Sequence, residues 1–211
     1  VMNVEFKKKS DLHLLRKAWH MLGVLLFFSI WNLFPFPKST IIFIVLWLLF
    51  VPGDIARLKY PRYNKIFNTL FKSILRSSEL NRLAGTTYLF TSVIFISLLF
   101  SHAIVSLSLL FLAFADPLAS FVGIKWGTRK IFGHKSYQGF LAAFAVCTLI
   151  TFIFLTYFNV DAPILLIAIL AGLCGALAEL IPLGQMDDNF TMPILSSICL
   201  YFLFIFFNIQ L

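Results

Sequence analysis

Seven apolar segments constrain this chain more than any other feature of its sequence. A transmembrane helix needs about 20 predominantly apolar residues, with some allowance for tilt. The segments that we expect to cross the membrane are 17–34, 38–53, 86–101, 103–121, 138–158, 162–181 and 190–209. With 60% hydrophobic residues and a mean hydropathy of +0.93, the chain lies outside the range of soluble proteins. The sequence therefore predicts an all-α, polytopic membrane helix bundle of about seven transmembrane helices, with 1–211 as one membrane-embedded domain.

Three longer polar loops connect these segments and determine the predicted orientation. They cover residues 54–85, 122–137 and 182–189. If the N-terminus is cytosolic, all three loops are cytosolic, together with all of the 17 lysines and arginines except Lys38. Positive charge in short loops favours the cytosolic side. We therefore predict an integral, multi-pass protein with a cytosolic N-terminus, in a bacterial inner membrane or the endoplasmic reticulum depending on the host.

The first of these loops, 54–85, alternates basic and apolar residues. Its apolar residues at the following positions have helical spacing: Phe67, Leu70, Phe71, Ile74 and Leu75. This pattern is typical of an amphipathic helix on the membrane surface, and we expect one on the cytosolic side. The alternative for most of its basic residues is simple attachment to anionic lipid.

Carboxylates gather where apolar segments meet the predicted cytosolic side. The stretch 178–189 contains Glu179, Asp187 and Asp188, followed by Asn189. Asp116 lies about six residues, or about 9 Å, inside the end of the fourth segment. Acids at such depth usually bind ions, phosphates or protons, and Mg²⁺ prefers one or two carboxylates plus substrate phosphates. The stretch therefore predicts an enzyme at the membrane that handles phosphates.

Glycines and basic residues alternate in and beside the loop 122–137. They are Gly123, Lys125, Gly127, Arg129, Lys130, Gly133, Lys135 and Gly139. Glycine permits close backbone approach, and basic side chains neutralise phosphate. The predicted helix that starts after Ser136 adds an N-terminus, which favours anions. An ordinary cytosolic loop can have the same composition, so this pattern by itself is weak.

Two further groups of charged residues have an ordinary explanation as well as a functional one. Arg16, Lys17 and His20 have spacings that place them on one helix face, where the first two would also serve as a basic anchor for the first span. Asp54 and Arg57 are three residues apart and could form a simple ion pair. Neither group identifies a function on its own.

Taken in order, these residues resemble the CTP-dependent lipid kinases, a family that includes endoplasmic-reticulum diacylglycerol kinase, dolichol kinase and phytol kinase. The matching blocks are Arg16-Lys17-x-x-His20, Asp54-x-x-Arg57, Asp116-Pro117-x-Ala119-x-x-x-Gly123-x-x-x-Gly127, Lys135-Ser136-x-x-Gly139-x-x-Ala142 and Ala178-Glu179…Asp187-Asp188-Asn189-Phe-Thr-x-Pro193. The last block is most similar to the diacylglycerol kinase branch.

The resemblance implies transfer of the CTP γ-phosphoryl group to a lipid hydroxyl, of diacylglycerol first and otherwise of a polyprenol or phytol. It implies Asp187 and Asp188 as Mg²⁺ ligands, with Glu179 and Asp116 completing the acidic set and one of these two acting as base. The triphosphate would be held by Arg16, Lys17, Lys125 and Lys135, with close backbone approach at Gly123, Gly127 and Gly139. His20 and Asn189 would hydrogen-bond phosphate or metal-bound water. Asp54, Arg57 and Ser136 are also placed among the nucleotide-binding residues.

Two other functions remain open from the sequence. A CDP-lipid synthase also uses CTP, Mg²⁺ and an acidic membrane site. An ion-coupled transporter could use Asp116 and Glu179 as carriers, although charges confined to one side argue against alternating access. We expect lipid, CTP and the bilayer as partners and no nucleic acid; the sequence does not constrain the oligomeric state, and we treat His134 as incidental.

Overall fold

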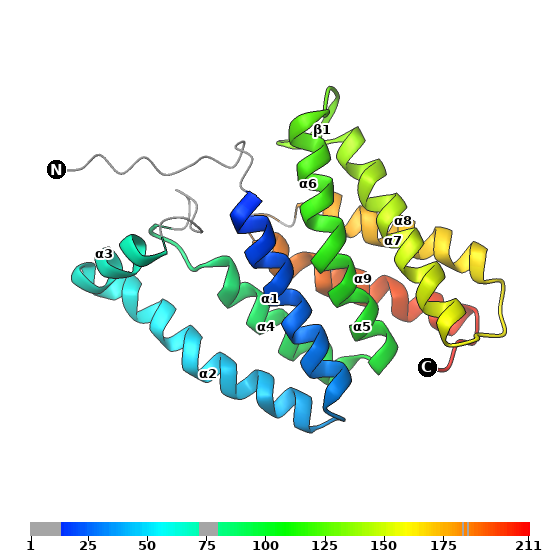
Figure 1. The fold of residues 1–211 in the computed structure, drawn as a ribbon, viewed down its shortest axis with the longest axis horizontal. Coiled ribbons are helices and arrows are strands. Elements are labelled where there is room, and N and C mark those ends of the chain that lie inside the picture. Colours follow the sequence, from blue (N-terminus) through cyan, green and yellow to red (C-terminus); the bar gives the residue numbers. More distant parts are fainter. Residues whose placement is uncertain (1–13, 72–79, 183, 185) are drawn as a thin grey trace.

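Each of the predicted apolar segments forms a helix in the structure, a computed structural model that describes residues 14–71, 80–182, 184 and 186–211 (Figure 1). The elements are α1 (Leu14–Leu33), α2 (Lys38–Lys59), α3 (Pro61–Leu70), α4 (Gly85–Leu99), α5 (His102–Leu110), the π-helix η2 (Phe111–Ala115), α6 (Asp116–Lys125), β1 (Lys130–Phe132), β2 (Lys135–Ser136), α7 (Tyr137–Tyr157), α8 (Ile164–Leu180) and α9 (Asp188–Phe206). The predicted all-α bundle is confirmed.

The helices have the length and surface of membrane spans. Five are long and apolar enough to cross a bilayer: α1, α2, the continuous helix His102–Lys125, α7 and α9; α4 and α8 are apolar but shorter. Large apolar side chains also point outward, with Leu22 on α1 63% exposed and Leu49 on α2 69% exposed. Apolar surface of this kind on several helices is stable in contact with lipid. The chain is a membrane protein.

The continuous helix 102–125 forms the centre of the bundle. More than half of the residues in its most apolar stretch are buried inside the protein, compared with about a fifth of the residues in the corresponding stretches of α1 and α2. Its buried middle packs against α1, α7 and α9. Beside it, α7 and α8 pack closely against each other and against the central helix. A Cβ at Gly175 on α8 would lie 2.6 Å from Cys147 Sγ on α7 and 2.9 Å from Phe111 Cδ2 on the central helix.

The central helix changes register just before Asp116. Residues 111–115 are π-helical, and α6 begins at Asp116 with Pro117 in its first turn. Proline has no N–H to donate to a carbonyl one turn earlier. π-helical turns within α-helices are frequent at functional sites, and this one places an acid at the point where backbone carbonyls become available.

Two of the three predicted cytosolic loops, 122–137 and 54–85, are shorter than expected, because helices extend into them. The segment 122–137 starts inside α6, which ends at Lys125, and continues as the β1–β2 hairpin, a small exception to the all-α fold. The segment 54–85 starts inside α2, so its separate helix is α3 and begins at Pro61. No side chain of α3 is buried in the protein. Ile74 and Leu75, which the sequence predicts to continue the amphipathic helix, lie outside the described residues.

Candidate active site

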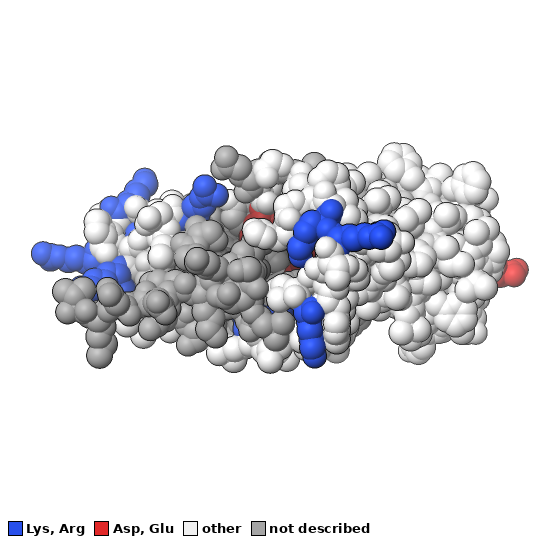
Figure 2. Space-filling model, turned by 90° about the horizontal axis from the view of Figure 1, so that it is seen from above, with Lys and Arg blue, Asp and Glu red and all other residues white. Residues whose placement is uncertain are grey.

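A cavity of about 180 Å³ collects polar side chains from distant parts of the chain. Its lining comes from the start of α1 (Arg16, Lys17, Trp19, His20, Gly23), the start of α4 (Ala84, Gly85, Thr86, Leu89), α6 (Asp116, Pro117, Ala119, Ser120, Ile124), the hairpin and start of α7 (His134, Lys135, Ser136, Gly139), the end of α8 (Glu179) and the start of α9 (Asp187, Asp188, Asn189). Seen from above in Figure 2, Lys and Arg side chains project from the surface, some acidic atoms are recessed near the middle of the view, and another acidic side chain protrudes at the right edge.

Lys135 lies among the carboxylates of this cavity. Its Nζ is 3.1 Å from Glu179 Oε1 and 3.4 Å from Asp188 Oδ2, and it also donates to the backbone carbonyl of Glu179. Burial acts to lower the pKa of Lys135, but the negative charges of Asp188, Glu179 and Asp116 outweigh it and raise that pKa above its usual value. Lys135 therefore stays charged and holds the end of α8 against the start of α9.

His20 and Asp116 form a second polar pair across α1 and α6. His20 Nε2 lies 3.6 Å from Asp116 Oδ2, and it is 3.3 Å from the carbonyl oxygen of Leu112. Leu112 belongs to the π-helical turn that precedes Pro117. The imidazole thus contacts both the backbone of that buried turn and the acid that follows it, with side-chain exposures of 14% for His20 and 23% for Asp116.

Lys17 attaches the start of α1 to α6, and its contact on α6 lies one turn after Asp116. Its Nζ donates to Ser120 Oγ at 2.7 Å and to the Pro117 carbonyl at 3.3 Å. Together with the His20 contacts, these bonds fix α1 beside the central helix. Ser120 was not singled out from the sequence, because a serine near a helix end has no chemical signature of its own.

The first turns of α4, α7 and α9 all contribute to the cavity lining. Asp187 caps α9 by accepting from Asn189 N at 3.0 Å, and Ser136 caps α7 by accepting from Gly139 N at 3.2 Å. The Asn189 side chain donates to the Gly85 carbonyl at 3.1 Å and so joins α9 to α4. Helix N-termini carry partial positive charge and bind anions, which adds to the basic side chains.

The acids of the cavity do not form a ready-made metal site. Within the part of the chain that the structure describes, no three His, Cys, Asp or Glu side chains converge closely enough to hold a metal ion. Lys135 supplies the positive charge between Glu179 and Asp188 instead. The assignment of Mg²⁺ to Asp187, Asp188, Glu179 and Asp116 therefore stays a prediction.

Asp54 and Arg57 lie outside the cavity. Asp54 Oδ1 accepts from Arg57 Nε at 2.6 Å, and its Oδ2 accepts from Ala84 N at 2.9 Å and Thr87 Oγ1 at 2.6 Å. Arg57, which is fully buried, donates to the Arg82 carbonyl at 2.6 Å. These bonds attach the end of α2 to the start of α4. The ordinary explanation, an internal ion pair, describes these two residues better than nucleotide contact.

Three predicted residues of the glycine-rich segment also lie outside the cavity. A Cβ at Gly123 would be 3.0 Å from Ser136 Oγ, and one at Gly127 would be 2.6 Å from the same atom, so both glycines permit close packing of the hairpin on α6. The Lys125 ammonium lies 4.7 Å from the centroid of the Trp126 ring. By contrast, His134 lines the cavity, and only the hairpin fold, which the sequence did not predict, brings it there.

Comparison with known proteins decides the family. A family model described as the cytidylyltransferase family matches residues 2–207. The chain is 30% identical over 166 residues to CTP-dependent diacylglycerol kinase 1 of Schizosaccharomyces pombe, and this match covers 72% of this chain and 76% of that protein. It is 31% identical over 176 residues to the protein of the same name in Saccharomyces cerevisiae, covering 74% of this chain and 59% of that one. This chain belongs to the CTP-dependent lipid kinases of the cytidylyltransferase family.

The family membership confirms the resemblance inferred from the sequence. A third relative, probable phytol kinase 1 of Oryza sativa subsp. japonica, is 29% identical over 214 residues, covering 94% of this chain and 67% of that protein. No solved structure matches the chain. The assignment of this lipid kinase to its family therefore rests on sequence relatives, and the arrangement of its cavity on the present structure.

Replacing Asp54 with Ala tests whether this pair is structural. Removal of the carboxylate leaves the buried Arg57 guanidinium without its oppositely charged partner, which typically costs about 3–5 kcal/mol. We expect a clear fall in the midpoint of denaturant unfolding of the detergent-solubilised kinase. Arg62→Ala on the exposed face of α3 serves as control and should change the midpoint little. Normal stability of Asp54→Ala together with lost CTP binding would instead support direct nucleotide contact.

Proposed function

We propose that this chain transfers the γ-phosphoryl group of CTP to the hydroxyl of a membrane lipid alcohol, with diacylglycerol as the acceptor. The observation that carries the proposal is the cavity in which Lys135, four carboxylates and the first turns of three helices converge. Family membership supplies the nucleotide. Diacylglycerol is preferred over phytol because the relatives at 30–31% identity are named diacylglycerol kinases.

The polyphosphate of CTP fits the basic part of this cavity. Arg16, Lys17 and Lys135 line it together with the N-terminal turns of α7 and α9, so positive charge approaches from several directions. Pockets that enclose a ligand usually measure about 300–1,000 Å³, whereas this cavity has about 180 Å³. We infer that it takes the phosphate end of the nucleotide and leaves the cytosine outside.

Asp116 is the carboxylate that we assign to the lipid hydroxyl. Glu179 and Asp188 already hold Lys135, whereas Asp116 lies beside His20, next to the more apolar part of the lining. In the transfer, the lipid oxygen bonds to the γ-phosphorus and the bond from that phosphorus to the β,γ-bridging oxygen breaks. CDP leaves with the electron pair, and the hydroxyl proton passes to the Asp116 carboxylate. Such proton transfer contributes about 10²–10⁴-fold to a rate.

A divalent cation that arrives with the nucleotide fits these residues. Mg²⁺ characteristically takes one or two carboxylates and completes its shell with water and substrate phosphates, so it needs no preformed cluster of three acids. Asp187 and Asp188, at the start of α9, are the carboxylates that we propose to hold it. When bound, Mg²⁺ would neutralise charge that develops on the transferring phosphates.

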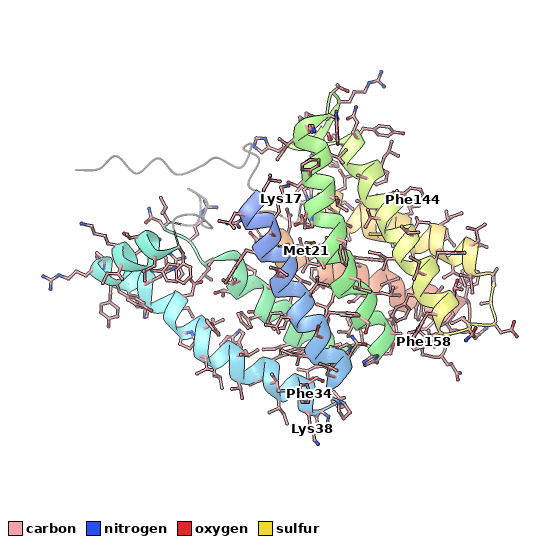
Figure 3. The ribbon with its side chains drawn as sticks, viewed as in Figure 1. Lys17, Met21, Phe34, Lys38, Phe144 and Phe158 are labelled. Atoms are coloured by element: carbon pink, nitrogen blue, oxygen red, sulfur yellow. The ribbon has the colours of Figure 1, made fainter. Side chains whose placement is uncertain are left out.

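The cavity end of the bundle is the end that we assign to the cytosol. Lys17 lies at that end, and Lys38 lies with Phe34 at the opposite end of the bundle (Figure 3). The separation agrees with the charge count of the sequence, in which Lys38 is the one basic residue on the far side. The same orientation gives the site access to cytosolic CTP.

The position of the label in the product tests the reaction itself. With purified protein, diacylglycerol and Mg²⁺, we expect γ-labelled CTP to give labelled phosphatidate and α-labelled CTP to leave the label in CDP. Label from the α-position in the lipid would show a cytidylyltransferase instead. Excess EDTA should abolish the transfer, and full activity in EDTA would remove the metal from the proposal.

Substitution of Asp116 by Asn tests the base assignment. The amide keeps the shape of the side chain but cannot accept the proton, so we expect kcat to fall by about 10²–10⁴-fold with the affinity for CTP little changed. Asp161→Asn is the matched control, because Asp161 is exposed in the α7–α8 connection and lies outside the cavity. Near-normal turnover of Asp116→Asn would exclude this carboxylate as the base.

Single cysteines test the orientation. In a background without Cys147, Cys174 and Cys199, Lys38→Cys and Arg129→Cys each place one thiol at an exposed position at opposite ends. In sealed vesicles whose cytosolic face is inside, a membrane-impermeant maleimide should label Lys38→Cys at once and Arg129→Cys only after detergent is added. The reverse pattern would invert the proposed topology.

A further inference from the structure

We infer that the acceptor lipid enters the cavity between α1 and α4, with its chain passing over Gly23 and its hydroxyl directed at Asp116. This inference rests on the proposed kinase function and assigns a place to its second substrate. Gly23 and Leu89 are the lining residues furthest along α1 and α4, respectively, from the first turns of these helices. Four observations lead to this assignment.

The lining changes from basic to apolar along α1. Arg16 and Lys17 lie in the first turn, His20 in the next, and Gly23 one turn deeper, about 9 Å from Lys17 along the axis. Figure 3 shows the direction, with Met21 placed from Lys17 toward the end of the bundle that carries Phe34. A phosphate donor suits the first part of this path and a lipid chain the last. The reacting oxygen would then lie between them, beside His20 and Asp116.

Gly23 faces open space rather than a packed neighbour. A Cβ at Gly23 would meet no atom within 4 Å, whereas a Cβ at Gly139, also in the lining, would lie 2.8 Å from the Ala119 carbonyl oxygen. Glycine is less favourable than alanine in the interior of a helix, and packing in the described part of the protein gives no reason for it here. Space for a bound molecule is such a reason.

The deep part of the cavity also borders the surface that contacts lipid. Gly23 is partly exposed, and its neighbours Leu22 and Leu26 on α1 are exposed apolar residues. α1 packs mainly on α2, α5 and η2, while α4 packs mainly on α2 and α9. The two helices share the cavity lining, and one turn below Gly23 they meet through Phe27 and Phe90, whose ring centroids are 5.0 Å apart. We therefore place the lateral route from the membrane above this ring pair, at the level of Gly23.

Spacing on α1 connects this route to the chemistry. Residues three apart lie on one helix face with about 5–6 Å between their Cβ positions, so Gly23 is the immediate neighbour of His20 on the cavity side. A lipid alcohol whose chain crosses Gly23 thus brings its hydroxyl to the His20–Asp116 pair, where His20 Nε2 and Asp116 Oδ2 are 3.6 Å apart.

Filling the space at Gly23 provides the test. We would compare wild type with Gly23→Ala and Gly23→Leu, and use Ala18→Leu as the control, because Ala18 is exposed on α1 and lies outside the lining. Transfer from γ-labelled CTP is measured in mixed micelles over a range of dioleoylglycerol at saturating CTP, and over a range of CTP at saturating lipid. The thermal midpoint of each variant is recorded as a check of folding.

We expect kcat/KM for dioleoylglycerol to fall at least 10-fold in Gly23→Leu and by less in Gly23→Ala, with KM for CTP within twofold of wild type. Ala18→Leu should behave as wild type, and Gly23→Ala should unfold at the same or a higher temperature. Unchanged kinetics in folded Gly23→Leu, or a rise in KM for CTP alone, would overturn the inference, since the space would then be unused or would belong to the nucleotide. Failure of the wild type to label lipid would instead reject the proposed function.

Discussion

The contact of Lys135 with Glu179 and Asp188 is the interaction on which the cavity depends. It joins the hairpin before α7, the end of α8 and the start of α9 at the point where their charged side chains meet. Two carboxylates at this depth would repel each other without a cation, and the negative charges of Asp188, Glu179 and Asp116, which raise the pKa of Lys135, favour its charged form. In the proposed reaction, the same ammonium would contact phosphate once Mg²⁺ takes its place between the acids.

The break in the central helix provides the other half of the site. Pro117 leaves backbone carbonyls of the preceding π-helical turn without an N–H partner, and His20 fills that need at Leu112. The contact fixes the imidazole beside Asp116 and, with the Lys17 bonds to α6, holds α1 against the centre. In the proposed reaction, the positive charge for the nucleotide and the base for the lipid thus come from two separate groups of side chains that line one cavity.

Much of this arrangement was predictable from the sequence, and the exceptions have physical reasons. Bilayer thickness sets the length of a span, so all seven helices were found, and acids near span ends had few alternatives to a shared site. The role of Asp54 and Arg57 could not be decided from the sequence, because an i,i+3 pair has the same spacing whether it binds a ligand or closes a structural contact. The structure places both residues outside the cavity lining. The positions of Lys125, outside the cavity lining, and His134, within it, could not be predicted, because the two-stranded hairpin between α6 and α7 is too short to leave a periodic pattern in the sequence.

A structure of the protein with Mg²⁺ and a non-hydrolysable CTP analogue would test the central claim most directly. We expect the triphosphate to occupy the cavity lined by Arg16, Lys17 and Lys135, with the metal on the carboxylates at the start of α9 and the γ-phosphate directed at Asp116. Phosphates bound instead near Asp54 and Arg57, or along the exposed side of β1, would contradict it.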